Sequence, residues 1–222
     1  RWTLDFGDSG VAAVERFRVT LAGGEISGNA ELRLDELGTS RLDAQFTDLN
    51  LGTLGGLSPD LPVRLAAVAD GAVALEWAGQ DVNTALGTVS TRLRALAPTT
   101  AALGMAGRLD LTLERETWTL SLDQTFADTV VLRGDVDGRR VDGDLAASSI
   151  IGRGSLDVGS LPDAIRRLRA AGLDIDEDMA GRVRGTVAAS FDLGGTLSAP
   201  SAVGTLEASE LWFDETGPGT AH

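Results

Sequence analysis

Apolar and polar residues alternate along most of this chain, and this alternation restricts its fold more than any other feature. In the first strand-like segment, Trp2, Leu4 and Phe6 fall on one side and Thr3 and Asp5 on the other. The same rhythm returns many times further along the chain. A period of two is typical of a β-strand with one buried face and one solvated face. The sequence therefore predicts an all-β protein.

A glycine begins several of the alternating segments, in the form G-x-h-x-h-x-h, where h is apolar. Gly28, Gly71, Gly107 and Gly185 each begin one copy. The apolar positions of the four copies are Ala30, Leu32 and Leu34; Val73, Leu75 and Trp77; Leu109, Leu111 and Leu113; and Val187, Ala189 and Phe191. Roughly fourteen strands of ordinary length fit the chain. Short polar turns join them, which favours a meander of antiparallel hairpins.

A long twisted sheet with one apolar face cannot stay flat in water. It must fold on itself, pack against a second layer, or curl around an apolar ligand. A glycine on the apolar face favours curling, because it removes side-chain bulk where a sheet bends. The alternative is a β-sandwich core, in which such a glycine marks a bulge or an edge.

Residues 161–172 break the period of two and predict a short amphipathic helix. Ser160 is a suitable N-cap, Pro162 suits the first turn, and Gly172 suits the end. Leucine and isoleucine recur at helical spacing at Leu161, Ile165 and Leu168. We expect this helix to plug an end of the β-structure or to cover part of its apolar face. A membrane-surface helix is the alternative.

Two other stretches carry weaker signals. Residues 90–103 are a second helical candidate, interrupted at Pro98. In the segment 194–212, the run Ala199-Pro200-Ser201 predicts a corner at which the chain reverses between two strands.

The composition excludes several function classes. The formal net charge is −14 and the isoelectric point is about 4.4, so neither nucleic acid nor an anionic membrane surface is an expected partner. The chain has no cysteine, and its one histidine is His222. Catalytic Ser-His-Asp and Cys-His arrangements are therefore excluded, as are zinc sites built from cysteine or histidine.

Carboxylates are the remaining candidates for chemistry, and the densest group is Asp174, Asp176, Glu177 and Asp178. Its start resembles a calcium loop, but Met179 stands where the loop needs glycine and Gly185 where it needs glutamate. The glycines of residues 152–159 and 194–195 do not match a dinucleotide-binding or phosphate-binding turn. We therefore expect no catalytic residue, no metal and no cofactor, and a protein that is not an enzyme.

The segment 181–211, GRVRGTVAASFDLGGTLSAPSAVGTLEASEL, resembles the repeats of the TamB and AsmA-like family of bacterial envelope proteins. The typical line of that family is a strand, then G-T-L-x-x-P-x-x-x-G-x-L, then another strand. Residues 17–34 and 42–54 resemble the family in a looser way. The resemblance covers most of the chain in character, and about its last forty residues in motif.

This resemblance implies a long curled antiparallel meander with a U-shaped cross-section and an aliphatic interior. It implies a phospholipid conduit in the periplasm of a diderm bacterium, and an outer-membrane assembly partner of the TamA type. The twelve apolar residues of the glycine repeat are then the expected lining of the groove. The alternative function is a structural β-sandwich or β-solenoid piece of a secreted or surface repeat protein.

We expect residues 1–222 to form one groove segment of a longer, repeat-built protein, because the chain opens at Arg1 without a methionine. Its partners would be phospholipids and flanking repeats of the same chain. No run of apolar residues is long enough to cross a bilayer, so any membrane anchor is expected outside this segment.

Overall fold

The computed structural model describes residues 5–6, 10–35, 38–55, 65–96, 102–141, 144–175, 182–213 and 216–221. These residues form one thirteen-stranded sheet and two short helices, which confirms the predicted all-β fold. The strands are β1 (Asp5–Phe6), β2 (Val11–Leu21), β3 (Gly24–Arg33), β4 (Thr39–Asn50), β5 (Leu65–Ala78), β6 (Asp81–Ala95), β7 (Leu103–Leu113), β8 (Thr117–Phe126), β9 (Val130–Val141), β10 (Asp144–Val158), β11 (Val183–Thr196), β12 (Ala199–Phe213) and β13 (Thr216–Ala221).

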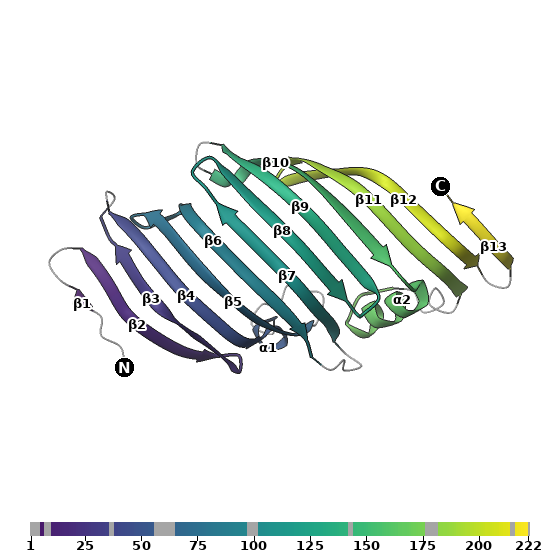
Figure 1. Cartoon of the computed structure of the whole chain (residues 1–222), viewed down its shortest axis with the longest axis horizontal. Helices are drawn as coiled ribbons and strands as arrows, with labels where there is room; N and C mark the ends of the chain where they lie inside the picture. Colours follow the sequence, from purple (N-terminus) through teal and green to yellow (C-terminus); the bar gives the residue numbers. More distant parts are fainter. Residues whose placement is uncertain are drawn as a thin grey trace.

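The sheet is a simple meander. Each strand pairs antiparallel with its neighbour in the sequence, so the spatial order is the chain order from β1 to β13 (Figure 1). One short parallel pairing, between Leu65 of β5 and Leu103 of β7, is added at one margin. A single antiparallel meander differs from both a two-sheet sandwich and a parallel solenoid. The predicted meander is confirmed.

The two margins of the sheet are built differently. At the hairpin end, strands are joined by tight turns such as those at residues 79–80, 114–116 and 197–198. At the helix end, tight turns at residues 22–23 and 127–129 alternate with longer connections. Two of these connections carry α1 (Leu51–Gly55) and α2 (Leu161–Ala170), and Figure 1 shows both helices along this margin.

Helix α2 matches the predicted helix closely. The Ser160 side chain accepts a hydrogen bond from the Asp163 backbone N–H at 3.4 Å, as an N-cap does. The helix ends at Ala170, and Gly172 follows with φ +109°, a left-handed conformation that stops the helix. Leu168 packs with Ala171 against Leu103 and Phe126 on the sheet, so the helix covers apolar surface at the helix end.

The second helical candidate, residues 90–103, is wrong. Residues up to Ala95 belong to β6, β7 begins at Leu103, and residues 97–101 lie outside the described part of the chain. Val89, Thr91 and Leu93 alternate correctly for a strand, and β6 is paired on both sides. Sheet pairing with two neighbours outweighs a weak local helical preference.

The predicted corner at Pro200 is also misplaced. The chain reverses at residues 197–198, and Pro200 is already the second residue of β12, opposite Gly195. Within the described residues, β13 pairs only with Ala208–Phe213, which leaves this part of β12 on an edge. A proline is tolerated there because no further strand needs its missing N–H.

The sheet curls strongly. Some Cα atoms of β6 and β10 lie within 8 Å of each other, whereas four strand spacings in a flat sheet would separate them by about 19 Å. Gly87 and Gly107 have φ +129° and +147°, a region that residues with a side chain rarely adopt. A Cβ at either glycine would overlap a carbonyl oxygen of the neighbouring strand. Both positions of the curled sheet therefore require glycine.

Candidate functional site

One face of the sheet is apolar across nearly its whole width. Residues directly opposite each other on paired strands share a face, so the register groups the side chains into rows. One row runs Ala30, Leu42, Leu75, Gly87, Leu113, Trp118, Gly138, Ile150. The next runs Gly28, Ala44, Val73, Val89, Leu111, Leu120, Val136, Gly152, Leu193, Ala202. We call this surface the apolar face.

The apolar face holds the residues that the sequence placed in a groove, with one exception. Ala30 and Leu32 lie on it from β3, and the predicted residues of β5, β7 and β11 lie on it through their register. Leu34 lies beyond the end of β3, where its N–H donates to the Gly10 carbonyl at 2.8 Å. The strand register therefore places all the predicted residues of three repeat copies on the apolar face, and two of the three residues of the first copy.

Several residues of this face were not in the predicted set. Leu42, Ala44 and Phe46 occupy it from β4, and Leu206 occupies it from β12. Each of these residues lies in an alternating segment, and Leu206 also follows Gly204 in the G-x-h pattern, so alternation was the signal that could have identified them. Arg140 shares the face too, two residues after Gly138 on β9, and its parity was the signal that could have revealed it.

Aromatic rings on the apolar face lie over glycines of neighbouring strands. The Phe46 ring covers Gly71, the Trp118 indole covers Gly138, and the position a Cβ would take at each glycine is filled by the ring. A ring laid across a glycine fills the space without raising the local surface. The rings thus fill the space that the missing side chains of the glycines would otherwise leave empty on the apolar face.

The groove is closed at its hairpin end. Arg140 of β9 donates from Nη1 to the Asn83 carbonyl at 2.9 Å and from Nη2 to the Ala85 carbonyl, both on β6. These bonds skip two intervening strands, and they show that the sheet curls toward the apolar face. Beneath them lies the hairpin-end cluster, formed by the buried side chains of Ala85, Leu113, Trp118, Val136 and Ile150.

Towards its flanks the apolar face is open. Leu206 of β12 is 58% exposed, and Leu21 and Leu32 near the other flank are 40% and 37% exposed. In the middle, Leu75, Trp77 and Leu111 pack against the hairpin-end cluster. The predicted lining therefore divides into a packed centre and flanks that solvent reaches.

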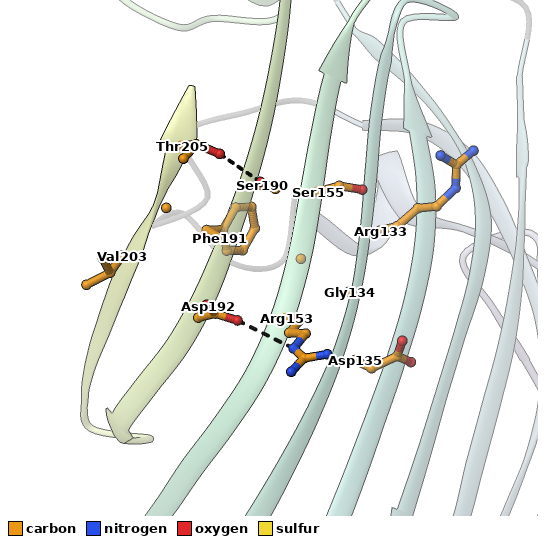
Figure 2. Close-up of a pocket in the computed structure, with 12 residues that line it drawn as sticks. Arg133, Gly134, Asp135, Arg153, Ser155, Ser190, Phe191, Asp192, Val203 and Thr205 are labelled. Atoms are coloured by element: carbon orange, nitrogen blue, oxygen red, sulfur yellow. Dashed lines mark hydrogen bonds and ion pairs between the residues drawn. The ribbon is translucent and has the colours of Figure 1, made fainter. Parts of the chain in front are cut away.

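The opposite face is mostly polar, although Ile151 and Val203 are exposed on it, and it carries a hollow of about 440 Å³ over β9 to β12. Figure 2 shows its side chains: Arg153 pairs with Asp192 at 3.5 Å, and the Ser190 and Thr205 hydroxyls lie 2.9 Å apart. The paired charges of Arg153 and Asp192 are 91% and 78% exposed. This arrangement is a solvated lattice of ion pairs, and it offers no nucleophile activated by a base.

Three charged residues of the polar face form a hydrogen-bonded network near the helix end. Arg94 donates to Asp70 at 2.9 Å and to Asp48 at 2.6 Å, and Asp70 accepts the Asp48 backbone N–H at 2.9 Å. The hydrogen bond from Arg94, and then the one from the Asp48 backbone, hold the pKa of Asp70 below its usual value. Asp48 has φ +54° at a bulge of β4, so this network fixes a strained turn.

Only some of the residues considered as metal ligands or catalytic groups lie in the described part of the chain. Asp174 of the acidic cluster is exposed, while Asp176, Glu177, Asp178 and His222 lie outside the described residues. Across the residues that are described, no three acidic, histidine or cysteine side chains are grouped as metal ligands. No described helix combines the length and apolar character needed to cross a membrane.

Within the described structure, the feature with the clearest capacity to bind a ligand is the apolar face. Its residues bring no catalytic group together, and its flanks present aliphatic side chains to solvent. No protein-family model, curated protein or solved structure matches this chain.

Proposed function

We propose that this chain is a non-enzymatic segment of a lipid conduit, in which phospholipid acyl chains lie against the apolar face. The observation that carries the proposal is the continuity of that face across successive strands, with aliphatic residues of β12 such as Leu206 exposed on it. A domain whose apolar residues served only to form a core would bury such leucines, whereas an exposed apolar surface marks a binding site.

The physical basis is removal of hydrocarbon from water. Each methylene group of an acyl chain gains about 0.8 kcal/mol when it is fully buried. The lining is mostly leucine, valine, alanine and glycine, with few polar groups to fix a ligand's position. Such a surface favours shallow binding that lets a chain slide along it, with the headgroup left at the open edge of the groove.

The resemblance of residues 181–211 to the TamB and AsmA-like repeats extends the proposal. On that basis the segment belongs to a longer protein of the periplasm that spans the envelope of a diderm bacterium. Flanking repeats would continue the groove, and an outer-membrane assembly protein of the TamA type would be a partner. The curled antiparallel meander supports this assignment as the architecture expected of such a repeat.

A second candidate is a purely structural segment of a surface or secreted repeat protein. The observation in its favour is the hairpin-end cluster, where Trp118 and Val136 fill the interior with protein side chains alone. Such a protein would bind no lipid at its flanks, which is the point on which the two candidates differ.

Native mass spectrometry and lipid extraction of the purified protein test the proposal. We expect co-purified phospholipid, and less of it in Leu206→Asp, which places a charge on the exposed flank of the apolar face. Thr205→Asp is the matched control, because Thr205 is the adjacent exposed residue and faces the polar side. A lipid-free parent protein would favour the structural candidate. Equal lipid content in the two variants would contradict binding of lipid on the apolar face at Leu206.

A further inference from the structure

At the closed end of the groove, three N–H donors have no acceptor among the described residues. They are Nε1 of Trp77, Nε1 of Trp118 and Nε of Arg140. Each of these atoms is buried, and an unmade hydrogen bond of a buried donor costs about 1 to 3 kcal/mol. Proteins rarely leave several such groups unsatisfied in one place.

The three donors belong to one site. Trp118 is part of the hairpin-end cluster, and Trp77 packs against it. The Trp118 nitrogen lies over Gly138, and Arg140 follows Gly138 by two residues on the same face of β9. Arg140 is also bonded to the carbonyl of Ala85, another member of the cluster.

Arg140 differs from the arginines of the polar face. Arg133 and Arg153 are more than half exposed and pair with carboxylates. Arg140 is 8% exposed, and within the described part of the chain its guanidinium bonds only to the backbone carbonyls of Asn83 and Ala85. Among the described residues, no carboxylate lies within ion-pair distance of it. A buried cation without a counter-ion is strongly unfavourable.

We propose that this site takes the anionic group of an amphiphile, a phosphate or a carboxylate, whose acyl chain lies on the apolar face. The inference rests on the proposed function. Its chemistry is specific because all three groups donate, and one carries a permanent positive charge. In the bound state the acceptor takes the place of the Ala85 carbonyl as the partner of Arg140.

The negative net charge of the protein makes a preference for an anionic ligand diagnostic of a local cationic site. With a formal net charge of −14, the protein repels anions at long range. A preference for an anionic over a neutral amphiphile must therefore come from a local cationic site. Charge-assisted hydrogen bonds contribute about 1.5 to 3 kcal/mol, which corresponds to roughly 10- to 100-fold in affinity.

Oleoyl lysophosphatidic acid and monoolein form a matched pair of probes, since they share the glycerol and the acyl chain and differ in the phosphate. Isothermal titration calorimetry should give at least about 10-fold tighter binding of the phosphate-bearing probe to the parent protein. Arg140→Met should abolish this preference, so that the two probes bind with equal affinity. Arg139→Met removes the same charge from the exposed side of β9 and should keep the preference.

A second variant guards against misfolding of Arg140→Met. Trp118→Phe keeps an aromatic ring over Gly138 and removes the N–H, so it should reduce the preference for lysophosphatidic acid over monoolein by several-fold. Asp142 and Asp144 follow Arg140 in the sequence, and their side chains lie outside the described residues. Their double replacement by asparagine should leave the preference at least as large as in the parent.

The outcomes separate the two proposals. Equal affinities of the parent for the two probes, or equal effects of Arg139→Met and Arg140→Met, would overturn the anion site while leaving the lipid groove in place. Glycerol 3-phosphate binding as tightly as lysophosphatidic acid would overturn it in favour of a site for free anions. If neither acyl probe binds, the proposed function fails and the anion site fails with it.

Discussion

The ring of Phe191 lies across Gly154 of the neighbouring strand. A Cβ at Gly154 would overlap the ring carbons Cζ and Cε2, and it would also lie 3.1 Å from the Arg133 carbonyl oxygen. The pair joins β10 to β11 on the apolar face, where Phe191 is also opposite Gly204 of β12. The Phe191 ring on β11 therefore leaves no space for a side chain at position 154 of β10.

Replacement of Gly154 by alanine should destabilise the fold by about 1 to 3 kcal/mol, because the ring must leave its position or the strands must separate. Chemical denaturation monitored by circular dichroism measures the change. Gly194→Ala is the control, since the nearest atom to a Cβ there is Ser201 Oγ at 3.6 Å. Equal stability of the two variants would contradict the assigned packing of Phe191 on Gly154.

Gly107 is expected to be intolerant of a side chain. Its φ of +147° strains any residue with a side chain, and a Cβ would come within 2.9 Å of the Gln124 Cα. We expect Gly107→Ala to lower the free energy of unfolding by about 1 to 3 kcal/mol. Gly104→Ala on the same strand should change it little, because the nearest contact is Ala95 Cβ at 3.8 Å.

Acid should weaken the fold through Asp70. Its pKa in the folded protein lies below the usual value of 3.8, chiefly because of the hydrogen bond from Arg94. The stabilisation is therefore complete above the unfolded-state pKa and is lost as the pH falls through the lower, folded-state pKa. Thermal midpoints of the parent should drop between pH 5 and pH 3 by more than those of Asp70→Asn. Identical pH profiles would show that the carboxylate contributes nothing.

The Ser160 cap should stabilise helix α2 modestly. Ser160→Ala removes the acceptor of the Asp163 N–H, and loss of an N-cap costs about 0.5 to 2 kcal/mol. The low end is expected, because the donor and acceptor are 3.4 Å apart. Ser149→Ala, at an exposed position of β10, is the control in the same denaturation experiment. An effect of Ser149→Ala as large as that of Ser160→Ala would contradict a capping role.

The alternation of residues carries most of the information about this fold. Face is determined by parity along a strand, so Val73 and Leu75 could be assigned to one surface before any partner strand was known. Antiparallel order followed from the short turns. The helix at 161–170 could be predicted because its cap, its proline and its apolar spacing are all local signals.

The features that escaped prediction depend on contacts far apart in the sequence. Residues 90–95 are held in a strand by neighbours on both sides, and Pro200 is accommodated by an absent neighbour along one edge of β12. Arg140 reaches carbonyls 55 and 57 residues away. No local pattern encodes a bond of that kind, because it exists only after the sheet has curled.

The pairing of every strand with its own chain neighbours also bears on how such a protein assembles and diversifies. Contacts between residues close in sequence form early in folding. The hairpins can therefore form one after another, and no strand has to pair with a strand distant in the sequence. Insertion or loss of a whole hairpin preserves the inward or outward parity of all remaining strands. Such a sheet can gain or lose strands in pairs during evolution while its apolar face and its polar face are preserved.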